Sequence, residues 1–274
     1  MVSYNATFYD RDGKLQGVFA AVRDVTERKS FEQTLQETNV QLERAILAKD
    51  RFLTSMSHEL RTPLNAIMGF TGTLLMKLPG PLTDEQENQL KTIKSGAHHL
   101  LSLINDLLDL AKIESGKVEI RPEPVELFGV IQEVISTLKP IAEQKGLEFT
   151  TQVPKDSVIV QTDRRALSQI LLNLTNNAIK FTEKGKVRLD LRQRQSDGKL
   201  LTEISVVDTG IGIREADQQK LFEAFSQVGK VSSRLSEGTG LGLHLSKKQA
   251  ELITGDISFK RVHGQGSTFT LTLK

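Results

Sequence analysis

The chain has 274 residues, of which 38% are hydrophobic, so it has enough apolar material for a sizeable core and a length that favours two domains. Its 36 basic and 34 acidic residues give a formal net charge of +2, which offers no field to recruit nucleic acid or an anionic membrane. Without cysteine there are no disulfides and no thiol catalysis, and without a long apolar run there is no predicted membrane span. We therefore expect no direct membrane contact and a cytoplasmic location, although a parent protein could carry upstream sensory or membrane segments.

Two short apolar runs open the chain, at residues 4–9 and 16–22. The turn residues Asp10 to Gly13 lie between them and predict a β-hairpin. Two strands alone are not stable in water, so the hairpin must dock, pair with another copy or stay loose. Together with the sequence DVTER at 24–28, it resembles the C-terminal hairpin and exit motif of a PAS sensor domain, and we assign residues 1–26 to such a remnant.

A heptad pattern follows over residues 27–45 and extends toward residue 56. One column holds Phe31, Thr38, Ala45 and Phe52, and the other holds Leu35, Leu42, Lys49 and Met56. This repeat predicts a two-stranded coiled coil, weakened where Thr38 and Lys49 replace apolar residues. A weak coil suits a signalling helix, and an imperfect coil without such a role explains the pattern equally well.

His58 lies in the helical sequence FLTSMSHELRTPL at 52–64. Helical spacing puts Thr62 on the same face as His58, with Glu59 beside the ring. Neutral imidazole is a nucleophile near pH 7, and an adjacent carboxylate can orient it or accept its proton. Pro63 should bend the helix just past the histidine. A lone histidine on such a helix is more often an ordinary surface residue, so this pattern alone decides little.

A turn at residues 78–81 reverses the chain, and Thr83 followed by Gln86 predicts a capping box for a second helix. Apolar residues then recur three and four apart through the rest of this segment. Two such helices cannot bury their apolar stripes alone. Residues 46–118 are therefore predicted to form an all-α antiparallel helical hairpin that dimerises into a four-helix bundle.

Helical and strand patterns alternate in residues 119–274. The helices are expected near 127–144, 163–182 and 246–253, and the strands near 147–153, 186–192, 201–207, 256–260 and 267–273. This order predicts an α/β sandwich, with helices over one face of a mixed sheet.

Three motifs in this second domain suggest a nucleotide site. On the amphipathic helix near 163–182, Asn173, Asn177 and Lys180 recur on a side apart from the apolar residues. Two amides and an ammonium could bind Mg²⁺ and meet phosphate, because Mg²⁺ takes few ligands from protein. A solvated polar face explains this stretch equally well.

The second motif is DTGIG at 208–212, directly after a predicted buried strand. Asp208 could accept a hydrogen bond from an exocyclic amine, while Gly210 and Gly212 would let the backbone approach a flat ring. Such turns are common, so the motif alone is weak.

The third motif is a glycine run that opens a helix, with Gly238, Thr239, Gly240, Leu241 and Gly242. Exposed N–H groups at a helix start form an anion site. Phe222 precedes a polar stretch at 226–236, which we interpret as a mobile lid. Arg234 within it could reach a terminal phosphate, although an isolated arginine is more often simply solvated.

The order of these segments resembles the sensor histidine kinases of two-component signalling, from about Phe31 to the end of the chain. The H, N, G1, F and G2 boxes of that family match at His58, Asn177, Asp208, Phe222 and Gly238. The resemblance implies that ATP phosphorylates His58, that Glu59 activates its ring, and that the phosphoryl group passes to an aspartate on the receiver domain of a response regulator. It further implies a homodimer, a Bergerat (GHKL) ATP-binding fold, and a phosphatase role for Thr62.

The same resemblance implies roles for the nucleotide-site residues. Asn177 would bind Mg²⁺ with Asn173 beside it, Lys180 would face phosphate, Phe181 would lie near the base, and Asp208 would recognise the adenine amine. The full set of expected nucleotide-binding residues is Asn173, Asn177, Lys180, Phe181, Asp208, Gly210, Gly212, Phe222, Arg234, Gly238, Thr239, Gly240, Leu241 and Gly242. Glu237 departs from the family, which often has a glycine there, and this puts the flexibility of the lid in question.

The sequence thus predicts an ATP-dependent protein histidine kinase in which positioning and charge neutralisation by Mg²⁺, Lys180 and Arg234 carry catalysis. Two other classes stay open. A conformational machine of the gyrase type would hydrolyse ATP in the same pocket, and a scaffold would bind nucleotide without turnover.

Overall fold

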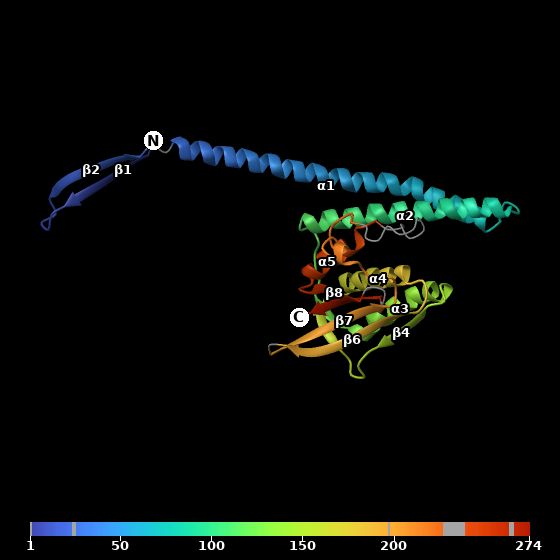
Figure 1. Cartoon of the computed structure of the whole chain (residues 1–274). Coiled ribbons are helices and arrows are strands. Elements are labelled where there is room, and N and C mark those ends of the chain that lie inside the picture. Colours follow the sequence, from blue (N-terminus) through green and yellow to red (C-terminus); the bar gives the residue numbers. More distant parts are fainter. Residues whose placement is uncertain (1, 24–25, 197, 227–238, 263–265) are drawn as a thin grey trace. The chain divides into compact units, whose positions relative to one another are not determined.

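A computed structural model describes the chain except for residues 1, 24–25, 197, 227–238 and 263–265 (Figure 1). The chain divides into two compact units, Met1–Ser55 and Met56–Lys274. None of the described helices is both long and apolar enough to cross a lipid bilayer.

The first unit contains an antiparallel pair of strands, β1 (Val2–Tyr9) and β2 (Leu15–Arg23), followed by the start of helix α1 (Thr26–Leu75). The carboxylate of Asp10 accepts the N–H groups of Asp12 at 3.0 Å and Lys14 at 2.8 Å, which closes the turn. The predicted hairpin is therefore confirmed. Its assignment to a PAS domain stays a prediction.

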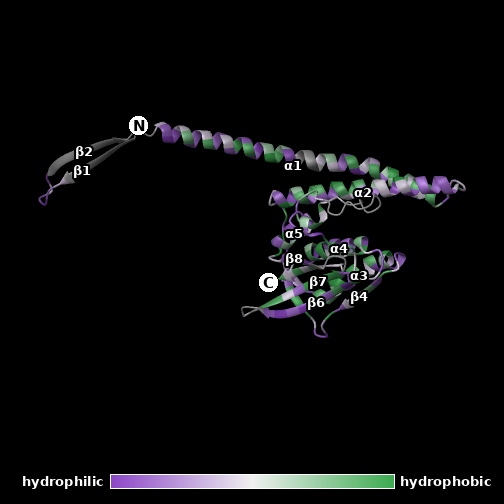
Figure 2. Ribbon diagram, viewed as in Figure 1, coloured by the Kyte–Doolittle hydropathy of each residue, from purple (hydrophilic) through white to green (hydrophobic). Residues whose placement is uncertain are grey.

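Helix α1 is 50 residues long and continues through Pro63. Hydrophilic and hydrophobic residues are mixed along its described parts (Figure 2). The heptad residues Phe31, Leu35 and Leu42 are 73%, 63% and 58% exposed in this single chain. These side chains are available for a coiled-coil seam, but the seam itself and the bend at Pro63 stay predictions.

In the second unit, α2 (Asp84–Glu114) runs back beside the part of α1 from Met56 onward (Figure 1). The Thr83 hydroxyl accepts the N–H of Gln86 at 3.2 Å, and the Gln86 side chain accepts the N–H of Thr83 at 2.9 Å. This confirms the predicted capping box. Arg61 on α1 donates to the side chain of Asn105 on α2 at 3.1 Å, so a polar contact joins the two helices.

The rest of the second unit is built on a five-stranded mixed sheet with the strand order β4-β6-β7-β9-β8. Its strands are β4 (Glu148–Gln152), β6 (Lys186–Ser196), β7 (Lys199–Asp208), β8 (Asp256–Val262) and β9 (Gly266–Leu273). Strand β4 is parallel to β6, and the other pairs are antiparallel. A separate antiparallel pair joins β3 (Glu123–Glu126) to β5 (Ile159–Thr162).

Helices α3 (Leu127–Gln144), α4 (Arg164–Phe181) and α5 (Gly242–Leu252) belong to this unit, and α3 and α4 lie on one face of the sheet (Figure 1). The core between them is formed by fully buried apolar side chains, among them Ile131, Leu167, Leu171, Leu174, Leu189, Ile204 and Leu271. Every second residue of β6 from Val187 to Leu191 is apolar, because Val187, Leu189 and Leu191 face the helices. The predicted α/β sandwich is confirmed.

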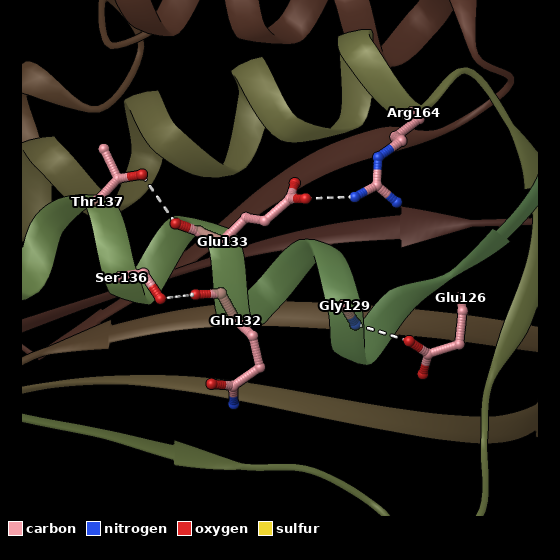
Figure 3. Close-up of polar contacts among 7 residues, drawn as sticks. All are labelled: Glu126, Gly129, Gln132, Glu133, Ser136, Thr137 and Arg164. Carbon is pink, nitrogen blue, oxygen red and sulfur yellow. Dashed lines mark hydrogen bonds and ion pairs between the residues drawn. The ribbon is translucent and has the colours of Figure 1, made fainter.

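Polar contacts fix the start of α3 and its position against α4. The Glu126 carboxylate caps α3 by accepting the N–H groups of Phe128 at 3.1 Å and Gly129 at 2.7 Å. Glu133 on α3 forms an ion pair with Arg164, the first residue of α4, at 2.6 Å (Figure 3). The two helices are thus joined by charge as well as by their buried faces.

Asp163 fixes the N-terminal end of α4. One carboxylate oxygen accepts the N–H of Ala166 at 3.0 Å, and the other accepts the N–H of Arg121, in the segment after α2, at 3.0 Å. Burial opposes ionisation, but hydrogen bonds from the backbone N–H groups of Arg121, Ala166 and Arg165 hold the pKa of Asp163 below its ordinary value.

We predict that Asp163→Ala lowers the free energy of unfolding by about 1–2 kcal/mol at pH 7, because the cap and the bond to Arg121 are lost together. The folded-state pKa is lowered, so the stabilisation by the carboxylate is complete above the ordinary pKa of about 3.9. It is lost as the pH falls through the folded-state pKa, and the difference between wild type and variant should shrink in acid.

Urea unfolding at pH 7 and at about pH 3 measures both effects. Asp156→Ala is the control, because Asp156 is exposed. A difference between wild type and Asp163→Ala that does not change with pH would contradict the assignment.

Candidate active site

His58 is exposed on α1, and its ring has no hydrogen bond or ion pair to any residue that the structure describes. The Thr62 hydroxyl, one turn later, donates to the backbone carbonyl of His58 at 3.3 Å. Glu59 is also exposed. The imidazole is therefore accessible to a reactant from solvent, while the Thr62 hydroxyl is turned toward its own helix.

Asp208 is the last residue of β7 and only 7% exposed. One carboxylate oxygen accepts the N–H of Gly210 at 2.8 Å and the N–H of Ser267 on β9 at 3.2 Å. Burial raises the pKa of Asp208 above its ordinary value, and the two backbone hydrogen bonds oppose this shift. The chain thus holds a buried acidic group in a fixed place at the end of a strand.

The loop after β7 lies very close to the end of α4. A Cβ atom on Gly210 would be 2.4 Å from the carbonyl oxygen of Phe181 and 2.9 Å from the Asp208 carboxylate. The N–H of Ile211 donates to that same carbonyl of Phe181 at 3.3 Å. Gly212 has a φ of +69°, which glycine adopts without strain. Gly210 is therefore needed for close packing against α4, and Gly212 for its backbone conformation. The predicted approach of these glycines to a flat ring stays a prediction.

Helix α4 carries Asn173, Asn177, Lys180 and Phe181, all of them half-buried. The Asn173 amide donates to the hydroxyl of Ser246 on α5 at 2.6 Å, so part of its side chain links the two helices. The Asn177 amide has no hydrogen-bond partner within the described ranges. The Lys180 ammonium lies 5.1 Å from the centroid of the Phe181 ring. The Asn177 amide and the Lys180 ammonium at the end of α4 are thus polar groups that could bind a ligand.

The glycine run continues into α5. A Cβ atom on Gly242 would be 2.6 Å from the side-chain oxygen of Asn173, so this glycine lets α5 approach α4. Gly240 has a φ of +69° and packs against the backbone of Phe225. Gly238 and Arg234, which the sequence also singled out, lie outside the described residues.

Thr239 and Leu241 contact the helical hairpin. The Thr239 hydroxyl donates to the Asp106 carboxylate on α2 at 3.0 Å and accepts the N–H of Leu241 at 3.0 Å. Burial raises the pKa of Asp106, and the Thr239 bond opposes this shift. Leu241 and Leu245 pack with Leu110 in a small apolar cluster. Sequence reasoning missed Asp106, whose one signal is a polar residue within an apolar helical pattern.

Phe222, in the segment before the glycine run, is half-buried. Its ring lies 6.1 Å from that of Phe259 on β8, and the Lys247 ammonium lies 5.5 Å from its centroid. The Phe222 carbonyl is 2.7 Å from the Nδ1 atom of His244 on α5. Phe222 therefore anchors its segment to α5 and the sheet.

The loop after β7 and the start of α5 thus both contact α4, the loop at Phe181 and α5 at Asn173. A surface hollow of about 350 Å³ lies elsewhere, between β4 and β6, and is lined by Gln152, Val153, Pro154, Leu191, Arg192 and Gln193. None of the residues singled out in the sequence lines it.

Two family matches cover most of the second unit. Residues 162–274 match the family described as "Histidine kinase-, DNA gyrase B-, and HSP90-like ATPase", and residues 48–116 match the "His Kinase A (phospho-acceptor) domain". These ranges contain α4, α5 and every strand of the sheet except β4, and the helical hairpin with His58.

Curated relatives agree with these matches. The "Uncharacterized sensor-like histidine kinase R01002" of Rhizobium meliloti (strain 1021) is 39% identical over 96% of this chain and 50% of its own length. The "Signal transduction histidine-protein kinase BarA" of Escherichia coli (strain K12) is 42% identical over 88% of this chain and 27% of its own length. The chain thus spans half or less of the length of these relatives.

A solved structure, "Crystal structure of ShkA full-length in complex with AMPPNP", is 33% identical with a TM-score of 0.64, over 81% of this chain and 45% of that chain. The "Acinetobacter baumannii histidine kinase AdeS" shares the fold at 24% identity, with a TM-score of 0.55 over 79% of this chain and 97% of that chain. With a phospho-acceptor hairpin followed by an ATPase domain, the chain belongs to the sensor histidine kinases of two-component signalling.

Proposed function

We propose that the chain is an ATP-dependent protein histidine kinase that autophosphorylates His58. The phosphoryl group would then pass to an aspartate on the receiver domain of a response regulator. The observation that carries this proposal is an exposed imidazole on α1, in the same chain as a site where α4, the loop after β7 and the start of α5 converge.

The convergent site suits adenine at its buried end. Asp208 is fixed by two backbone N–H groups, so its remaining acceptor capacity could meet an exocyclic amine in one orientation only. Gly210 lets the loop beside Asp208 pack against the end of α4, where Phe181 offers an apolar ring. A flat base with an amine donor matches this combination of groups.

The phosphates would lie toward the cationic and amide groups. Lys180 supplies positive charge next to Phe181, and the N–H groups at the start of α5 supply partial positive charge. Thr239, Gly240, Leu241 and Gly242 are proposed phosphate-side residues because they lead directly into that helix. For Gly238 and Arg234, the proposed role at the phosphates rests on the family resemblance alone.

A magnesium ion fits the residues present. In the described ranges no cluster of three or more His, Asp or Glu side chains could hold a metal by itself, so any ion must share its ligands with phosphate. Asn177 would be its protein ligand through the amide oxygen, with Asn173 beside it. When bound, Mg²⁺ neutralises charge on the β- and γ-phosphates.

At the acceptor, a ring nitrogen of neutral His58 would attack the γ-phosphorus. The nitrogen–phosphorus bond forms as the bond to the β-phosphate oxygen breaks, and ADP leaves. Glu59 would orient the ring or accept its proton. Thr62 is a proposed phosphatase residue, and its hydroxyl would have to leave the His58 carbonyl to position a water molecule.

The hairpin also supports the proposed homodimer. Several of its apolar side chains are substantially exposed in the single chain, namely Leu60, Ile67, Ile93, Leu100 and Leu107. Pairing two hairpins in a four-helix bundle would bury these residues. The coiled coil of residues 27–45 would extend the same interface.

We predict that wild-type chain incubated with γ-labelled ATP and Mg²⁺ acquires an acid-labile, base-stable label, and that His58→Gln abolishes it. His98→Gln is the matched control, because His98 is also exposed on the hairpin. Label that persists in His58→Gln would show that another residue is the acceptor. ATP hydrolysis without any label would instead favour a machine of the gyrase type.

We further predict that Gly210→Ala weakens the binding of a fluorescent ATP analogue at least about tenfold, or about 1.4 kcal/mol. The added methyl group would collide with the Phe181 carbonyl and the Asp208 carboxylate. Gly96→Ala on α2 is the control, because a Cβ there meets nothing within 4 Å. Unchanged affinity in Gly210→Ala would contradict the placement of the base at this loop.

A further inference from the structure

The carbonyls at the C-terminal end of α4 are all satisfied by groups outside the backbone ladder of the helix. Such carbonyls have no partner within a helix and need one elsewhere. The Ala178 carbonyl accepts the hydroxyl of Thr182 at 2.7 Å. The Phe181 carbonyl accepts the N–H of Ile211 at 3.3 Å. The two carbonyls between these, of residues 179 and 180, are left for a third partner.

That partner is Lys145. Its ammonium donates to the carbonyl of Ile179 at 2.8 Å and to the carbonyl of Lys180 at 2.9 Å. A cation at this position also opposes the partial negative charge at the end of a helix. One side chain thus satisfies two carbonyls and adds a favourable charge.

The end of α3 explains how Lys145 reaches α4. Lys145 is the C-cap residue of α3, and its backbone N–H is bonded to carbonyls of the last turn of that helix. Gly146 follows with a φ of +68°, and the N–H of Leu147 returns to the carbonyl of Ala142 at 2.9 Å. This tight ending fixes the backbone of Lys145, so its long side chain leaves α3 in a defined direction.

Lys145 acts on the same turn of α4 that carries Lys180 and Phe181. That turn is bonded to the loop after β7 through Ile211, and the preceding residue of that loop, Gly210, is bonded to Asp208. Hydrogen bonds and the short backbone segments between them therefore connect Lys145, through the end of α4, to the buried carboxylate. Each step is a direct contact between neighbouring groups.

We propose that Lys145 is a positioning residue for the nucleotide site, because it holds the last turn of α4 against the loop of residues 208–212. The inference rests on the proposed function for the identity of the ligand. Without the ammonium, two carbonyls at the end of α4 would turn to water and the last turn would fray. Lys180 and Phe181 would then lose their fixed placement, and the bond from Ile211 would weaken.

The test compares Lys145→Met with Lys139→Met in the full chain. Methionine has an unbranched side chain of similar length, but it has no charge and no hydrogen-bond donor. Lys139 lies on the same helix, and its one ion pair within the described part of the chain is an exposed one with Glu143 of α3, at 3.8 Å. Lys145→Arg restores a cation with several donors, and should rescue what methionine loses.

Two readouts separate positioning from general stability. We expect the dissociation constant of a fluorescent ATP analogue with Mg²⁺ to rise about three- to tenfold in Lys145→Met, as for the loss of one charged hydrogen-bonded contact. The KM for ATP in autophosphorylation should rise while kcat stays within about twofold. Without nucleotide, the amide of Ile211 should exchange its hydrogen several-fold faster than in wild type.

Lys139→Met should change none of these quantities. If Lys145→Met binds the analogue like wild type and Ile211 exchanges at the wild-type rate, the proposal is wrong. Should Lys145→Met fail to fold, Lys145→Gln, which keeps one donor without charge, is measured in its place and should show a smaller change of the same sign. If wild type binds no nucleotide, the proposed function fails, while Ile211 exchange still decides the role of Lys145.

Discussion

Helix α4 is fixed at both of its ends by groups from other segments, and the candidate nucleotide site depends on this fixation. Asp163 caps its first turn and also holds the segment after α2. Lys145 and Ile211 bind the carbonyls of its last turn. Between the ends, a fully buried apolar face locks its rotation against α3 and the sheet. The polar face with Asn177 therefore has one orientation relative to Asp208 at the end of β7.

Two carboxylates, Asp208 and Asp106, are alike in being removed from solvent and hydrogen-bonded by neutral donors. Burial raises the pKa of both carboxyl groups, and for Asp106 the Thr239 hydroxyl and the charge of His99 oppose this shift. Their partners are neutral donors, two backbone N–H groups for Asp208 and the Thr239 hydroxyl for Asp106. Recognition by such groups depends on direction rather than on net charge, which suits a ligand read by its hydrogen-bonding pattern. His58, by contrast, is solvent-exposed, as its proposed role as the acceptor of a phosphoryl group from ATP requires.

Sequence patterns predicted the local features well, because those features depend on neighbouring residues. The hairpin turn at Asp10, the capping box at Thr83 and the glycines after Asp208 all follow from turn and cap chemistry. The small sheet of β3 and β5 was not predicted, since its strands are short, one contains Pro124, and they pair across more than thirty residues. Helix α5 begins at Gly242, earlier than expected, because burial of Leu241 and Leu245 overrides the low helix propensity of glycine. The contacts of Lys145, Asn173 and Asp106 join distant segments, and no local pattern contains them.

The central claim is that nucleotide binds where α4, the loop after β7 and the start of α5 meet. Hydrogen exchange measured by mass spectrometry, with and without Mg²⁺ and a non-hydrolysable ATP analogue, tests it most directly. We expect slower exchange in residues 177–182, 208–213 and 240–246, with no change at the hollow between β4 and β6. Slower exchange confined to that hollow, or no change anywhere in residues 119–274 at a saturating concentration of analogue, would contradict the claim.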